Sequence, residues 1–145
     1  MGLVFLYRLS NFLYKKKIPV IPKIIQTVIR VIYACYLPYS AEIGPKTVFL
    51  HGGLGVVIHE HAKIGANCVI MPNVTIGGTR KKKRVPVIGD NVKIGTGAKI
   101  IGGIDVGSGV VIAANSVVIK DLPDRTLVAG VPAQIKKVGI DFNCY

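Results

Sequence analysis

Aliphatic residues recur every six positions along most of this chain, and this period limits the folds that the chain can adopt. The spacing is six throughout, except for one interval of twelve between Ile76 and Ile88. The repeating positions are Ile58, Ile64, Ile70, Ile76, Ile88, Ile94, Ile100, Val106, Ile112 and Val118. An α-helix repeats about every 3.6 residues and a strand about every two, so neither explains the pattern.

A β-helix of triangular cross-section does explain a six-residue period. Each side of the prism takes six residues, and one aliphatic side chain of each hexad points into the interior. Glycine often follows the aliphatic residue, at Gly65, Gly77, Gly89, Gly95 and Gly107. We expect these glycines to take strained turns with positive φ, where a Cβ would clash. The period therefore predicts an all-β solenoid, a parallel β-helix of hexapeptide repeats with a short N-terminal α-helical segment.

The chain divides into three regions around this repeat. Residues 1–38 contain no acidic residue, and Pro19 and Pro22 separate two apolar segments that we expect to form short helices, at about 2–17 and 22–36. Residues 39–138 hold the β-helix, and residues 139–145 form a tail. The helical region is either a cap that docks on the solenoid or on a neighbouring subunit, or a basic amphipathic element that rests on an anionic membrane.

The repeat is interrupted twice, and insertions in a solenoid commonly carry its function. One interruption precedes Ile58 and places His51 in a glycine-rich segment, at residues 50–55. The other follows Ile76 and contains five consecutive basic residues, Arg80 to Arg84. We interpret this run as an arm that attracts the phosphates of a cofactor or an anionic acceptor, and a merely solvated loop is the alternative.

Composition narrows the classes of partner. The formal net charge of +12 favours anionic partners. Nucleic acid is not expected, because no aromatic side chains are interleaved with the basic run to stack on bases. Three cysteines without CxxC spacing indicate a reducing compartment, hence a cytoplasmic protein, and argue against a disulfide framework or a zinc site.

The sequence resembles the hexapeptide-repeat acyltransferases. The resemblance rests on NVTIGGT at 73–79, VIGDNVKIGTGAKIIGGIDVG at 87–107 and NSVVIKDLPDRTLVAGVPA at 115–133. Within that family the chain is most similar to the serine O-acetyltransferases and their exopolysaccharide O-acetyltransferase relatives. The resemblance implies a left-handed parallel β-helix, a homotrimer, acetyl-CoA bound as co-substrate in grooves between subunits, and no metal.

The resemblance also assigns roles to individual residues. His51 matches the general base, and Arg84 matches the residue that binds the acceptor. Tyr36 and Val85 stand where the family has an orienting aspartate and a second histidine. The positions that match the cofactor site are Gly78, Thr79, Thr96, Ala98, Ala114 and Lys120. A neutral imidazole is suited to take the proton of an attacking hydroxyl.

Two further histidines, His59 and His61, flank Glu60 and point to the same outward face. They either line the groove or are ordinary surface histidines, and no third nitrogen or sulfur ligand is close enough in sequence to suggest zinc.

These observations predict a CoA-dependent O-acetyltransferase whose acceptor is a hydroxyl group. We expect a sugar of a polysaccharide or of its precursor as the acceptor, and serine is the alternative. A catalytically inert β-helix that serves as a binding or assembly module is the second alternative. Contact between residues 1–38 and the inner face of the membrane is a further expectation.

Overall fold

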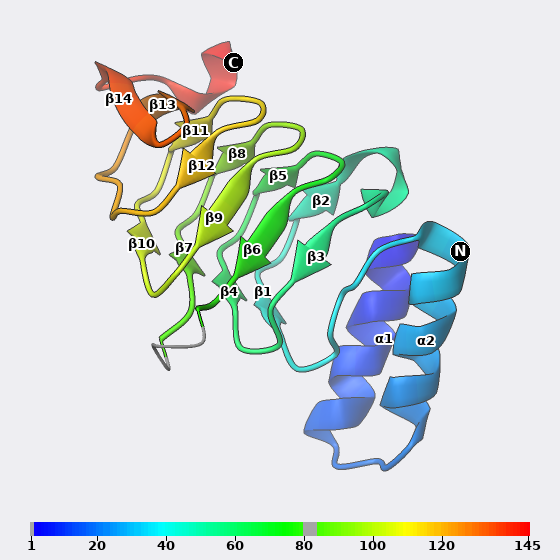
Figure 1. Ribbon diagram of the computed structural model, residues 1–145. Helices are drawn as coiled ribbons and strands as arrows, with labels where there is room; N and C mark the ends of the chain where they lie inside the picture. Colours follow the sequence, from blue (N-terminus) through cyan, green and yellow to red (C-terminus); the bar gives the residue numbers. More distant parts are fainter. Residues whose placement is uncertain (1, 80–83) are drawn as a thin grey trace.

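The computed structural model describes residues 2–79 and 84–145. Two helices, α1 (Leu3–Lys15) and α2 (Ile21–Tyr33), form a hairpin beside the first coil of a solenoid of short parallel strands (Figure 1). Both expected helices are present, although α2 ends at Tyr33, where Ala34 takes a left-handed conformation. Residues 80–83 of the basic run lie outside the described residues, and of that run only Arg84 is placed.

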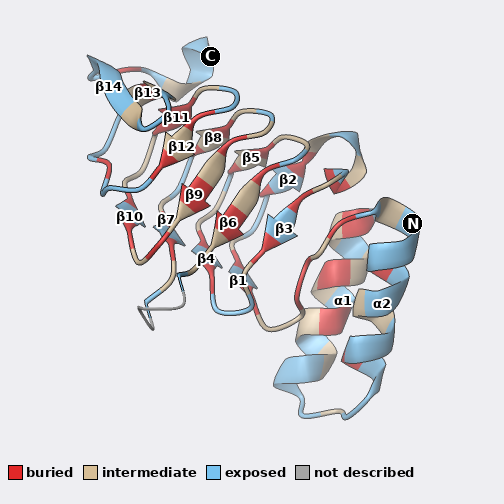
Figure 2. Cartoon of the chain, viewed as in Figure 1, coloured by how far each residue is buried: buried red, intermediate tan, exposed pale blue. Residues whose placement is uncertain are grey.

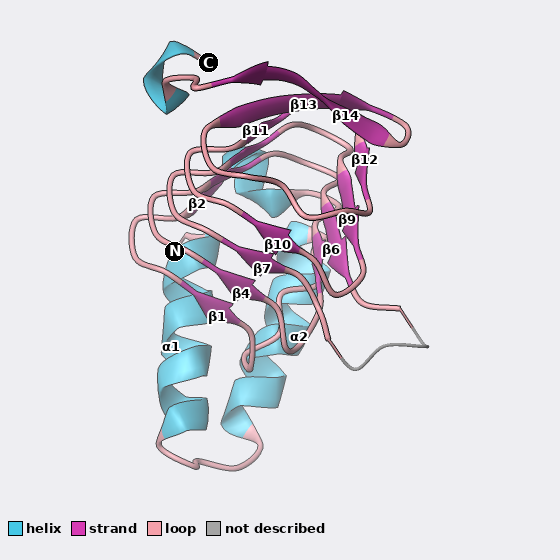
Figure 3. Cartoon of the chain, turned by 90° about the vertical axis from the view of Figure 1, so that its left-hand side faces the viewer, coloured by secondary structure: helices cyan, strands magenta, loops and turns pink. Residues whose placement is uncertain are grey.

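Strands β1 to β12 pass through three sheets in strict rotation, which builds a triangular prism (Figure 3). Sheet I contains β1 (Glu42–Ile43), β4 (Lys63–Ile64), β7 (Val87–Ile88) and β10 (Asp105–Val106). Sheet II contains β2 (Val48–Phe49), β5 (Val69–Ile70), β8 (Lys93–Ile94), β11 (Val111–Ile112), β13 (Thr126–Gly130) and β14 (Ala133–Val138). Sheet III contains β3 (Val57–Ile58), β6 (Thr75–Gly77), β9 (Lys99–Ile101) and β12 (Val117–Val118). The fold is thus the left-handed parallel β-helix that the sequence predicts.

The repeating aliphatic residues form the interior column of this prism. Parallel pairing stacks Ile70 on Ile94 and Ile94 on Ile112, and the other two sheets repeat the arrangement. All ten repeat positions are buried, as the period predicts, and Figure 2 shows buried segments on strand after strand of the solenoid. Small residues such as Ala62, Cys68 and Val74 fill the column between them. The six-residue period therefore encodes a continuous apolar core.

The glycines that follow these positions do not play the predicted role. None of the five has a positive φ, and asparagines such as Asn67 and Asn91 take the left-handed turns instead. A Cβ at Gly65 would lie 2.5 Å from the carbonyl oxygen of Gly89 in the next coil. Gly65, Gly89, Gly95 and Gly107 are therefore needed because successive coils approach to within about 4.8 Å, where a side chain would collide with backbone. A Cβ at Gly77 would make only ordinary contacts.

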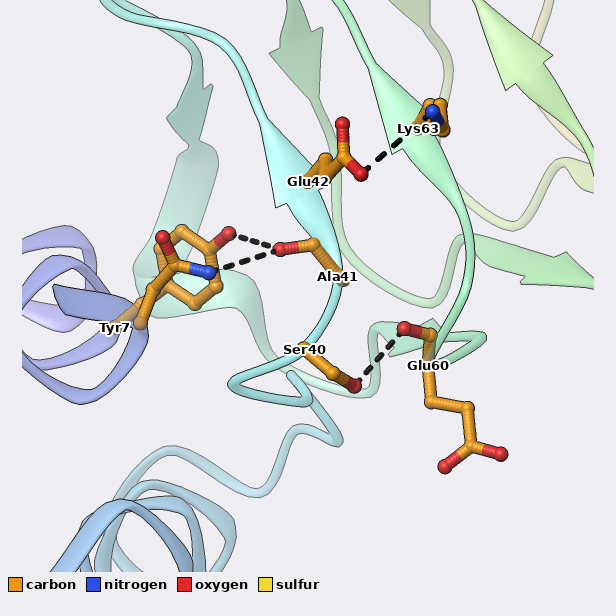
Figure 4. Close-up of polar contacts among 7 residues, drawn as sticks. Tyr7, Ser40, Ala41, Glu42, Glu60 and Lys63 are labelled. Atoms are coloured by element: carbon orange, nitrogen blue, oxygen red, sulfur yellow. Dashed lines mark hydrogen bonds and ion pairs between the residues drawn. The ribbon is translucent and has the colours of Figure 1, made fainter. Parts of the chain in front are cut away.

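Polar side chains of α1 fasten the helical hairpin to the first coil (Figure 4). The hydroxyl of Tyr7 donates a hydrogen bond of 2.6 Å to the carbonyl oxygen of Ala41. The amide of Asn11 donates to the carbonyl oxygen of Tyr39 at 2.7 Å, and the guanidinium of Arg8 donates to the carbonyl oxygens of Ile43 and Gly44. These bonds fix the hairpin against β1.

The chain ends beyond β14 in a short turn, η2 (Phe142–Cys144). Within the part of the chain that the structure describes, no helix is both long enough and apolar enough to span a bilayer.

Candidate active site

Two edges of the prism carry the residues that the sequence analysis selects. The loops from sheet II to sheet III form one edge, here called the II–III edge, and contain residues 50–56, 71–74, 95–98 and 113–116. The loops from sheet III to sheet I form the III–I edge and contain residues 59–62 and 102–104 together with the described ends of the second interruption. Sheet III separates the two edges, and its six-residue side is roughly 15–20 Å wide.

His51 lies on the II–III edge, in a short 3-10 turn, η1 (Leu50–Gly53). Its backbone is left-handed, with φ 51° and ψ 38°, a conformation that costs a residue with a Cβ about 1–2 kcal/mol. The imidazole is exposed, and within the described residues no hydrogen bond to another side chain or to the backbone holds it. Lys17, Lys46 and Arg125 are also exposed with a positive φ, so the backbone conformation alone does not distinguish His51.

The turn that carries His51 is packed against both helices. A Cβ at Gly53 would lie 2.7 Å from Cδ2 of Leu3 on α1, and one at Gly52 would lie 3.4 Å from Cδ1 of Tyr33 on α2. Both glycines have a positive φ, 67° and 69°, and both lie against side chains of the helices. The helical hairpin thus positions the candidate base, although it is distant from it in sequence.

Tyr36, at the position of the family's orienting aspartate, lies on the outer face of sheet III and pairs with Val57 of β3. The guanidinium carbon of Arg30 stands 5.9 Å from the centre of its ring, close enough for a cation–π contact. Tyr36 lies between two hollows, one toward Gly55 and Ala34 and one toward His59 and Gly78.

The predicted cofactor residues divide between the two edges. Thr96 and Ala114 are exposed on the II–III edge and lie in adjacent coils, because each follows by two residues one of the paired positions Ile94 and Ile112. Ala98 is on the same edge, but it is fully buried and both its backbone groups are hydrogen bonded. Its side chain packs in the column, so it cannot contact a ligand on the surface.

Gly78, Thr79 and Lys120 lie on the III–I edge. Gly78 follows Ile76 and Lys120 follows Val118, and these aliphatic residues are two coils apart in sheet III, a separation of about 10 Å. Thr79 and Lys120 are exposed. This edge therefore offers a flexible cation and two small residues to a ligand that runs along the prism.

His59 lines a hollow of about 400 Å³ on the same edge, together with Tyr36, Gly77 and Gly78. A Cβ at Gly78 would lie 3.5 Å from Nε2 of His59 and 3.1 Å from Cγ1 of Val85. Nδ1 of His59 accepts a hydrogen bond of 3.1 Å from the backbone N–H of His61, which leaves Nε2 to carry the proton of the neutral ring. The His59 ring therefore presents a donor to the hollow.

The sequence does not show which of His59 and His61 lines the groove, whereas the structure does. The side chain of His61 is 70% exposed and lies 3.7 Å from Glu60, whereas His59 is half-buried in the hollow. The two-residue period of a strand places both side chains on one face. Gly78, in the following coil, lies against the ring of His59, and this contact shows that His59 is the residue that lines the hollow. Within the described residues, no cluster of three or more His, Cys, Asp or Glu side chains could hold a metal ion.

Arg84 is exposed on the III–I edge and forms an ion pair with Asp105 at the start of β10. The hydrogen bond from its guanidinium to this carboxylate raises the pKa of Arg84 above its ordinary value. The residue that the resemblance assigns to acceptor binding thus already has an anionic partner in the chain.

Comparisons with known proteins agree with this geometry. The model of the family described as bacterial transferase hexapeptide (six repeats) matches residues 86–120. A serine acetyltransferase of Bacillus pumilus is 40% identical over 147 residues, which cover 97% of this chain and 67% of that protein. The chain belongs to the serine acetyltransferase family.

Two further comparisons cover a smaller share of the related protein. The serine acetyltransferase of Synechococcus elongatus is 38% identical over 131 residues, which cover 89% of this chain and 53% of that protein. A solved serine acetyltransferase in complex with CoA has a TM-score of 0.84 and 34% identity, covering 92% of this chain and 55% of its own. The chain thus spans between about half and two thirds of the length of the relatives named here.

Proposed function

We propose that this chain is an acetyl-CoA-dependent O-acetyltransferase in which His51 is the general base. The observation that carries the proposal is the exposed imidazole of His51, held on a strained turn of the II–III edge, on the same edge as Thr96 and Ala114. Membership of the serine acetyltransferase family supports the same chemistry.

Acetyl transfer requires the protein to position the acceptor hydroxyl against the thioester and to transfer a proton. His51 takes the proton of the acceptor hydroxyl as its oxygen attacks the thioester carbonyl carbon, which is worth about 10²–10⁴-fold in rate. The same imidazolium returns the proton to the sulfur as the carbon–sulfur bond breaks. Backbone N–H groups at a corner such as Gly77–Gly78 are suited to stabilise the negative charge that develops on the carbonyl oxygen.

The division of the site supports a homotrimer. His51, Thr96 and Ala114 lie on one edge of sheet III, whereas Gly78, Lys120 and Arg84 lie on the other. Within one subunit the two sets are separated by a flat sheet roughly 15–20 Å wide, so they do not line one groove. In a closed threefold assembly, the II–III edge of one subunit faces the III–I edge of the next, and the two sets would line one groove.

Charge on the III–I edge suits the phosphates of CoA. Lys120 is exposed there, and Arg84, the described residue of the basic run, lies on the same edge. A chain with a net charge of +12 attracts an anionic cofactor over long range, so its affinity for CoA should fall as salt is added.

Serine is the acceptor that the relatives favour, in preference to the sugar expected from the sequence, because the relatives compared above are named serine acetyltransferases. A sugar hydroxyl remains the second candidate on one specific observation. Arg84, which would bind the carboxylate of serine, is paired with Asp105, so the site is less cationic than its sequence indicates.

The deciding experiment measures release of the CoA thiol from acetyl-CoA in the presence of serine, amino sugars, nucleotide sugars or oligosaccharides. Turnover with serine and not with sugars supports the first candidate, and the reverse supports the second. A thermal-shift titration with CoA separates both from an inert module. A chain that neither binds CoA nor consumes acetyl-CoA would contradict the proposal.

A further inference from the structure

The helical hairpin exposes an unusual share of the large apolar side chains. Ten of the nineteen exposed large apolar residues of the described chain lie between residues 5 and 32. They are Phe5, Leu9, Phe12, Tyr14, Val20, Ile21, Ile24, Val28, Val31 and Ile32. Soluble surfaces rarely gather apolar side chains in this way unless something covers them.

On α2 these residues form a second apolar face. Ile21, Ile24, Val28 and Val31 follow one another at intervals of three or four, which places them along one side of the helix. This side is separate from the one that carries the buried residues Pro22 and Ile29. Lys23 and Arg30 lie on the remaining side, so the helix is amphipathic even in its exposed part.

The turn between the helices contributes exposed lysine side chains and an exposed valine. Val20 is exposed with φ 68°, a conformation that is strained for a β-branched residue. Lys15, Lys17 and Lys23 line a hollow of about 810 Å³ beside Ile18 and Val20. In Figures 1 and 3 this turn projects away from the solenoid.

Charge decides between the possible occupants of this surface. Residues 1–41 contain six Lys and Arg and no Asp or Glu, which is half of the net charge of +12. A second copy of the hairpin would bring its six positive charges against six like charges. A partner that is both apolar and anionic fits this hairpin, and an anionic lipid bilayer has both properties.

We propose that the helical hairpin binds the surface of an anionic lipid bilayer. Its apolar residues, Val31 and Ile32 among them, enter the interface, and the lysines of the turn contact the lipid phosphates. The helices are 13 residues long, about 20 Å each, so they lie in the interface and do not cross it. The proposal is independent of the acetyl transfer proposed above, because it involves no residue of that site.

The test is cosedimentation of the full chain with vesicles, without CoA or acceptor. We expect binding to vesicles of phosphatidylglycerol and phosphatidylcholine, little binding to phosphatidylcholine alone, and release at high salt. The double substitutions Val31→Ser with Ile32→Ser and Lys15→Gln with Lys17→Gln should each weaken binding by about tenfold or more.

Matched controls come from β14, at the opposite end of the molecule (Figure 1). Ile135→Ser with Val138→Ser removes one isoleucine and one valine that are also exposed, and Lys136→Gln with Lys137→Gln removes two charges. Both control pairs should bind vesicles like the unmodified chain. Equal losses in control and test pairs would show that binding is general electrostatics and would overturn the proposal.

Two other results would also overturn it. Absence of binding to the anionic vesicles is one. The other is a smaller molecular mass by light scattering for the Val31→Ser, Ile32→Ser variant in the absence of lipid, since this face would then be a contact between subunits. Loss of vesicle binding with unchanged consumption of acetyl-CoA would leave the proposed function untouched.

Discussion

The guanidinium of Arg84 reaches from the end of the second interruption to the carboxylate of Asp105 in the next coil. Both side chains are more than half exposed, so this pair is solvated and contributes little to the stability of the fold. The pair matters because Asp105 reduces the positive charge that Arg84 presents to a ligand. As long as Asp105 is ionised, an anionic acceptor must compete with it for Arg84.

We expect Asp105→Asn to lower the KM for serine and Arg84→Gln to raise it by about tenfold or more, because a hydrogen bond between charged groups is lost. Neither change should alter the KM for a neutral sugar. The measurement is initial rate against acceptor concentration at fixed acetyl-CoA. Lys63→Gln, which removes an exposed cation paired with Glu42 on sheet I, is the control. Equal changes in the KM for charged and neutral acceptors would show that Arg84 does not bind the carboxylate of the acceptor.

Removal of the His51 imidazole should reduce turnover by about 10²–10⁴-fold. His51→Asn is the preferred variant, because asparagine adopts the left-handed backbone of this position at a lower cost than alanine. CoA affinity and melting temperature should stay close to those of the unmodified chain. His61→Ala, at an exposed position, is the control. A larger loss in His59→Ala than in His51→Asn would move the base to the III–I edge.

The buried hydroxyl of Tyr7 should limit stability at alkaline pH. Burial raises the pKa of Tyr7 to about 12, against about 10 in an unfolded chain. The stabilisation is complete below about pH 10 and is lost as the pH rises toward about 12, because the unfolded chain ionises first. Tyr7→Phe should cost about 1 kcal/mol at neutral pH, by loss of the bond to Ala41, and should flatten this alkaline decline. Urea denaturation across that range measures both effects, and parallel curves for the two proteins would contradict the assignment.

Only one of the three thiols should react readily in the folded chain. Burial raises the pKa of Cys35 to about 11 and also raises the pKa of Cys68, and both side chains are enclosed by the core. Cys144 is exposed near the end of the chain. A chromogenic disulfide reagent should label one thiol quickly at neutral pH and all three after denaturation. Rapid labelling that persists in Cys144→Ser would show that the core opens more often than its packing indicates.

A methyl group at Gly65 should destabilise the fold by about 1–3 kcal/mol, because its Cβ would meet the backbone of Gly89. Gly2→Ala, where no atom lies within 4 Å of the added carbon, is the control for the same change in composition. Thermal unfolding of the two variants provides the comparison. Similar melting temperatures would mean that the coils can separate at little cost.

The six-residue period predicted the sheets and the buried column correctly, because each hexad must place one aliphatic side chain inside for the coils to stack. The role that this pattern predicted for the glycines, turns with positive φ, was wrong. Local conformation suggested a need for positive φ at Gly65, whereas the actual constraint comes from Gly89, 24 residues later in the next coil. Contacts between coils depend on loop lengths that periodicity alone does not fix.

The candidate site was likewise predictable only where the sequence itself marks a feature, and not where it depends on contacts between coils. His51 could be found because an interruption of the period marks an irregular turn. The hollow beside His59 and the pairing of Arg84 with Asp105 depend on which residues of separate coils lie side by side. The interval of twelve between Ile76 and Ile88 hides that register from any local motif. Predictions for Arg80–Lys83 stay predictions, because these residues lie outside the described chain.

The reversal of the last strand has a consequence for how the molecule behaves at high concentration. β14 runs antiparallel to β13, whereas every earlier pairing in sheet II is parallel. A second copy placed on this edge would present its β2 in a direction that cannot continue the parallel ladder, and at the opposite end the hairpin of α1 and α2 lies beside the first coil (Figure 1). Continuation of the parallel ladder from one copy into the next is therefore interrupted at β14.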